Sequence, residues 1–128
     1  MKKIFFLSLL FICNLGLAQD STQSGWETVK TFQGSGIKNT ERFTVNSSEW
    51  KIYYFSKESN VGMEGAGHIF QAFLLAPGQE LWQGEIVANE ANKKTIKGET
   101  YIYKSGTFYF KSNSANGDWE IRIMVPKK

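Results

Sequence analysis

DWEIRIMV, residues 118–125, is the stretch that decides the fold class. Every second residue in it is bulky and apolar, and the residues between them are charged or flexible. This two-residue period places one set of side chains on each face of a β-strand, so the segment predicts a strand with one buried face. The inward set is Trp119, Ile121, Ile123 and Val125, and the outward set is Glu120, Arg122 and Met124.

Two further strands carry a lysine that identifies the outer face. Lys51 lies within the expected strand 49–56, and Lys111 lies within the expected strand 107–112. Because side chains alternate between the faces, each lysine assigns its whole strand. The aromatic residues that this assigns to the outside are Tyr53, Phe55 and Tyr109. The residues assigned to the core are Trp50, Ile52, Tyr54, Phe108 and Phe110.

Short alternating runs continue from Trp26 to the C-terminus, separated by Gly, Asn, Ser and Pro at roughly ten-residue intervals. This spacing predicts an all-β fold, a single antiparallel β-sandwich of seven or eight strands with a jelly-roll or Ig-like arrangement. The polar segment 88–97, ANEANKKTIK, predicts a loop. The expected strands cover 26–32, 40–45, 49–56, 68–75, 80–87, 99–103, 107–112 and 118–125.

We expect the last two strands to form a hairpin. A four-residue loop from Ser114 to Gly117 places Lys111 opposite Glu120, whereas a two-residue turn would bring two positive charges together. Opposite charges across a pair are favoured, so the pattern predicts the longer loop, with the glycine at a positive φ.

Residues 1–18, MKKIFFLSLLFICNLGLA, have the layout of a secretory signal peptide: a basic start, an apolar stretch and a small-residue end. We expect cleavage after Ala18 and an exported protein, periplasmic or secreted. Cys13 follows Ile12 rather than a small residue, which does not fit a lipoprotein signal. The apolar stretch is too short for a transmembrane segment, which needs about 20 apolar residues.

The expected mature chain consists of a polar, flexible leader, residues 19–25, and a single β-sandwich domain, residues 26–128. It contains no cysteine, so its core alone must stabilise it. Loss of Lys2 and Lys3 with the signal leaves 13 of the 15 basic residues against 12 acidic ones. This near-neutral balance argues against nucleic acid or an anionic membrane as the main partner. The sequence does not show the oligomeric state.

Two blocks resemble small secreted bacterial β-sandwich modules, including pre-peptidase C-terminal-like domains. They are GSGIKNTERFTVNSSEWKIYY, residues 34–54, and SGTFYFKSNSANGDWEIRI, residues 105–123. The shared features are a Gly-Thr entry, an inward Trp and a closing aromatic and Trp-x-Ile pattern. The resemblance implies a β-sandwich that is not itself catalytic, and it implies no binding residue.

The chain has few side chains of the kinds that act in catalysis or bind metal ions. His68 is the only imidazole, so a histidine metal site or a Ser-His-Asp triad would have to be built entirely around it, and metal sites usually need three or four ligands. We therefore expect no enzyme activity, no metal and no cofactor, and we expect His68 to be a surface or capping residue. The glycine-dense segment 62–67 predicts a loop between strands, where Met63, Glu64 and His68 are candidates for a recognition loop.

Aromatic residues are the one compositional excess, at 15 % of the chain. Exposed rings can stack on sugars or anchor a protein interface at low entropic cost. The outward rings Tyr53, Phe55 and Tyr109 are therefore the candidate ligand surface, with Tyr109 joining the other two only if its strand shares their sheet. The leading hypothesis is an exported non-enzymatic binding module for a protein or glycan of the cell envelope. The alternative is a small secreted inhibitor of a hydrolase that acts through the 62–67 loop.

Overall fold

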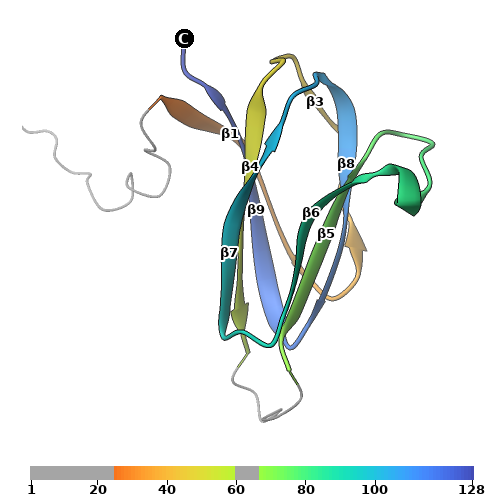
Figure 1. Cartoon of the computed structure of the whole chain (residues 1–128), viewed down its shortest axis with the longest axis vertical. Helices are drawn as coiled ribbons and strands as arrows, with labels where there is room; N and C mark the ends of the chain where they lie inside the picture. The colour runs from red at the N-terminus through yellow and green to blue at the C-terminus, as the bar shows by residue number, and fades with distance from the viewer. Residues whose placement is uncertain (1–24, 60–66) are drawn as a thin grey trace, which may run out of the picture.

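The computed structural model describes residues 25–59 and 67–128. Two antiparallel sheets pack face to face, and apart from one short 3-10 turn the regular elements of the described chain are all strands (Figure 1). The protein is therefore an all-β sandwich, as the alternating pattern predicts. No helix among the described residues has the length and apolar character needed to cross a membrane.

The first sheet has the strand order β1–β9–β4–β7, and every pairing in it is antiparallel. β9 lies between β1 and β4, so the first and last strands of the fold are neighbours, with Trp26 opposite Pro126. The bounds are β1 (Trp26–Ser35), β4 (Trp50–Glu58), β7 (Thr95–Ile102) and β9 (Gly117–Pro126).

The second sheet has the order β2–β8–β5–β6, and β3 also pairs with β8. Between β5 and β6 the chain forms the 3-10 turn η2, which protrudes on the right of Figure 1. The bounds are β2 (Lys38–Asn39), β3 (Phe43–Val45), β5 (Ile69–Leu75), η2 (Leu81–Gln83), β6 (Glu85–Ala91) and β8 (Gly106–Ala115).

The predicted inward sets meet between the two sheets. Those with at most 7 % exposure are Trp50, Ile52, Tyr54, Phe108, Phe110, Trp119, Ile121 and Ile123. Phe43 of β3 stacks on Phe110 of the neighbouring β8 at 5.3 Å, and it links the two layers by meeting Trp50 of β4 edge-on at 6.1 Å. β5, whose inner face the sequence leaves unassigned, contributes Phe70, Ala72 and Leu74. The face assignments of the patterned strands are confirmed.

The prediction of a loop at 88–97 is wrong. These residues belong mainly to β6 and β7, and the chain turns between them at Asn92, whose φ is 62°. β6 and β7 are the edge strands of their sheets, where polar side chains can face solvent, so polarity does not indicate a loop there. The strand expected at 80–87 begins later, because η2 precedes it.

Only the second half of the range expected at 40–45 is a strand, β3, and β2 lies just before that range as a separate strand. The break lies at Thr40, whose hydroxyl accepts a hydrogen bond from the backbone N–H of Phe110 and donates to the carbonyl of Glu41. Because β2 falls outside every expected range, the described chain contains nine strands, one more than the upper expected number.

The predicted hairpin between the last two strands is also wrong. β8 and β9 belong to opposite sheets, so they do not pair. Lys111 lies opposite Phe73 of β5 rather than opposite Glu120. The chain crosses between the sheets at Asn116, which takes the positive φ of 62° that we expected at Gly117. Consecutive strands often pair, but in a sandwich the chain can instead change sheets between them.

Lys51 points away from the core, as predicted, but only 3 % of it is exposed. Its Nζ lies 3.0 Å from Glu99 Oε2, 4.7 Å from the ring centre of Trp26 and 5.6 Å from that of Tyr101. The ion pair and the two rings replace water around the ammonium group. Met124, expected on the same outer face, is completely buried beside it.

The two core tryptophans differ in the hydrogen bonding of their indole N–H groups, and a matched pair of variants tests this difference. Trp50 Nε1 donates a hydrogen bond to the carbonyl of Lys104 at 2.8 Å, whereas the buried Trp119 Nε1 has no hydrogen-bond partner in the described chain. We predict that Trp50→Phe costs about 1 kcal/mol more unfolding free energy than Trp119→Phe, because it leaves a carbonyl without its donor. Urea unfolding of both variants measures the difference; equal losses would contradict it.

Candidate functional site

The outer face of the first sheet is hollowed around Phe55. The hollow is open and has a volume of about 480 Å³. Its side chains come from three adjacent strands: Gln33 and Ser35 from β1, Asp118 and Glu120 from β9, and Phe55 and Lys57 from β4. We call this site the Phe55 hollow.

Strand register brings these side chains together. Glu120 lies opposite Gln33 on one side and opposite Phe55 on the other, and Asp118 lies opposite Ser35 and Lys57 in the next row. Gly34 forms part of the wall, and a Cβ atom there would lie 2.7 Å from the ring of Trp119. Glycine at this position therefore lets β1 lie close over the core tryptophan.

The hollow carries both signs of charge. Glu120 accepts a hydrogen bond from Gln33 Nε2 at 3.0 Å and forms an ion pair with Arg122 Nε at 2.5 Å. Asp118 and Lys57 are exposed, and neither takes part in an ion pair within the described chain. A ligand in the hollow would therefore meet one exposed carboxylate, one exposed ammonium group and one aromatic ring.

The two outward rings of β4 have different surroundings. Phe55 is half-buried and lines the hollow. Tyr53 is also half-buried, and the guanidinium of Arg122 lies over its ring at 5.6 Å. Of this predicted pair, Phe55 contacts the hollow and Tyr53 supports the arginine that holds Glu120.

Tyr109 does not join the other two rings. It lies on β8, in the second sheet, opposite Leu75 of β5. The three candidate aromatic residues are therefore divided between the two outer faces of the sandwich.

His68 is completely buried rather than at the surface, where we expected it. Its Nδ1 lies 2.7 Å from the carbonyl of Lys93, and its Nε2 lies 2.8 Å from Ser56 Oγ. The serine hydroxyl in turn lies 2.7 Å from the carbonyl of Asp118. These contacts join β4, the start of β5, the β6–β7 turn and β9 at one end of the sandwich.

Gly117 lies so close to His68 that there is no room for a side chain at residue 117. A Cβ atom at residue 117 would lie 2.6 Å from His68 Nε2 and 2.6 Å from the carbonyl of Lys57, so glycine is required there by space. Ser56 and His68 are both fully buried, and a ligand at the surface cannot reach them. The other loop candidates, Met63 and Glu64, lie outside the described residues.

No group of three or more His, Cys, Asp or Glu side chains in the described chain is placed to hold a metal ion. Three aromatic residues outside the candidate surface are exposed: Trp82 at 82 %, Tyr103 at 71 % and Tyr101 at 43 %. The sequence also gives no sign of Gln33, Asp118 or Glu120 as site residues, because only the pairing of β1 with β9 places them beside Phe55.

No family model, no curated protein and no solved structure matched the chain.

The buried contacts of His68 predict a stabilising role. We expect His68→Ala to lower the unfolding free energy by about 2–4 kcal/mol, because it leaves polar groups unpaired and a cavity behind. A double-mutant cycle with Ser56→Ala should give a coupling of about 0.5–3 kcal/mol by urea unfolding. Strictly additive losses would show that the two side chains do not interact.

Proposed function

We propose that this protein is an exported, non-enzymatic binding module for a protein or glycan of the cell envelope, and that the Phe55 hollow is its ligand site. The observation that carries the proposal is an open hollow in which an aromatic ring, two carboxylates, an amide and an ammonium group lie side by side. Rings, carboxylates and amides together can contact both apolar surfaces and hydrogen-bonding groups of a ligand.

The position of the hollow supports binding at low entropic cost. β4 is paired along its length with β9 on one side and β7 on the other, so the backbone that carries Phe55 is fixed before a ligand arrives. A preformed site loses little conformational entropy on binding.

The groups around the hollow also support a non-enzymatic role. The only histidine of the chain is completely buried and does not line the hollow, and Glu120 is already paired with Arg122 and Gln33. The resemblance to secreted β-sandwich modules points in the same direction.

A capture experiment tests the hollow. Immobilised residues 19–128 carrying Phe55→Ala should capture tenfold less ligand from an envelope extract than wild type, a loss of about 1.4 kcal/mol. Tyr103→Ala, which removes an exposed ring elsewhere, is the matched control and should capture normally. Bound protein is quantified by mass spectrometry and bound sugar by monosaccharide analysis.

Two treatments of the extract separate the ligand classes. Prior proteolysis should abolish capture of a protein ligand, and prior mild periodate oxidation should abolish capture of a glycan. Unchanged capture by a folded Phe55→Ala variant would contradict the assignment of the hollow.

Export is tested by the mass of the protein after secretion. We expect the intact mass of residues 19–128, because Gly16 and Ala18 provide the small side chains that signal peptidase requires before the cut. A mass that includes a lipid-modified Cys13 would contradict cleavage after Ala18.

A further inference from the structure

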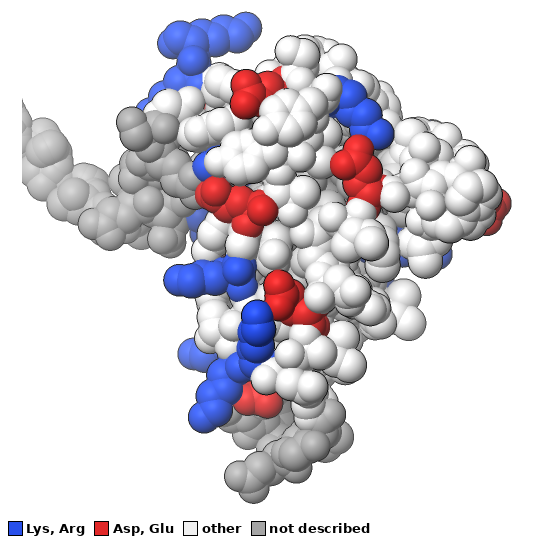
Figure 2. Space-filling model, in the orientation of Figure 1, with Lys and Arg blue, Asp and Glu red and all other residues white. Residues whose placement is uncertain are grey.

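The outer face of the second sheet differs from the Phe55 hollow in its charge. Among the outward-facing residues of β5, β6 and β8 in the described chain, Lys111 is the only charged one. In Figure 2 the surface over η2 and the adjoining strands, on the right, is mostly uncharged, whereas charged side chains follow β7 on the left. We define the amide face by Gln71, Phe73, Ile86, Asn89, Tyr109 and Asn113.

Three side-chain amides form a row across this face. Asn89 of β6, Gln71 of β5 and Asn113 of β8 are successive cross-strand partners. Gln71 Nε2 donates to Asn89 Oδ1 at 3.0 Å, and Asn113 Nδ2 makes a longer 3.5 Å contact with Gln71 Oε1. The amides hold one another in a line perpendicular to the strands.

The row retains most of its hydrogen-bonding capacity. Each amide offers two N–H donors and a carbonyl oxygen, and only two contacts within the row use them. Adjacent strands are about 4.8 Å apart, so the three amides span about 10 Å. That length is on the scale of a disaccharide, whose hydroxyl groups can both donate to and accept from amides.

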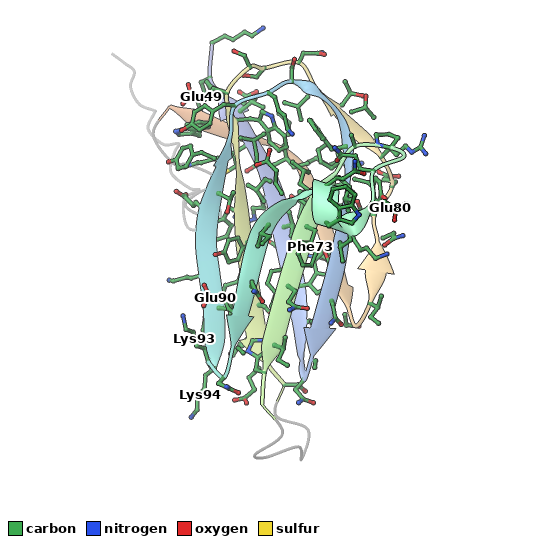
Figure 3. All side chains as sticks on the ribbon, turned by 45° about the vertical axis from the view of Figure 1, so that its right-hand side comes forward. Glu49, Phe73, Glu80, Glu90, Lys93 and Lys94 are labelled. Carbon is green, nitrogen blue, oxygen red and sulfur yellow. The ribbon has the colours of Figure 1, made fainter. Side chains whose placement is uncertain are left out.

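Apolar side chains lie next to the amide row. Phe73 and Ile86 are cross-strand partners one row away, and Ile86 is 62 % exposed. Tyr109 lies one row further on β8, diagonal to Phe73. Figure 3 shows Phe73 on the sheet beside the turn that carries Glu80. A pyranose ring has apolar C–H faces as well as hydroxyl groups, and both kinds of partner are present here.

We propose that the amide face binds a neutral glycan chain lying across β6, β5 and β8. The near absence of charge argues against an anionic polymer, which would need several basic groups to bind. This site lies on the sheet opposite the Phe55 hollow and does not depend on it.

Affinity electrophoresis tests the proposal with defined probes. The folded protein is run through gels that contain a neutral polysaccharide (dextran, soluble β-glucan, galactomannan or arabinoxylan) or an anionic one (alginate or polygalacturonate). We expect retardation by at least one neutral polymer, equal in low and high salt, and none by the anionic polymers.

Two variants of the central amide locate the site. Gln71→Ala should weaken binding of the retarding polymer tenfold or more, and Gln71→Glu, which keeps the size but removes the donor, should do the same. Tyr103→Ala, which removes an exposed ring outside the amide face, is the control and should bind normally. Thermal melting confirms that each variant is folded.

Each contrary result overturns the proposal. Migration unaffected by every neutral polymer would exclude a neutral-glycan site. Salt-sensitive retardation by the anionic polymers alone would identify a charge-driven surface. Retardation that survives both Gln71 changes but is lost in Phe55→Ala would move glycan binding to the hollow, supporting that site and excluding the amide face.

Discussion

Burial of aromatic and branched side chains between the two sheets is the constraint on which the structure depends. The only cysteine in the sequence is Cys13, so no disulfide within the chain can supplement the core. Fully burying one large apolar side chain contributes roughly 1.5–3 kcal/mol. The core layer around Trp50, Phe110 and Ile121 therefore fixes the distance between the sheets. It also holds in place the strands that carry the surface sites.

Polar groups that are buried outside this layer define the ends and edges of the sandwich. His68 joins four elements at one end, and Lys51 is covered by Trp26 and Tyr101 on the outer face of the first sheet. Each is stabilising only because its partners are in place, since an unpaired buried polar group costs about 1–3 kcal/mol. When all their hydrogen bonds are made, such groups restrict how the strands can be arranged.

The sequence predicts which side chains face the core, because that depends on local alternation. It does not predict which strands pair with one another. The inward positions of Trp50 and Trp119 follow from a two-residue period that any strand must obey. The sheet to which a strand belongs has no such local signal, so Tyr109 and Phe55 look equivalent in sequence and lie on opposite faces. Edge position is equally invisible, and for that reason the polar residues of β6 and β7 resemble a loop.

The central place of β9 in the first sheet has a consequence for the timing of folding. β9 pairs with β1 and with β4, so two of the three pairings in that sheet require the last strand of the chain. Contacts between residues so distant in sequence form slowly, because a long loop must close before they can stabilise anything. During synthesis, the first sheet therefore stays incomplete until β9 has emerged. Until then β1 and β4 each lack a neighbouring strand that the folded sheet requires.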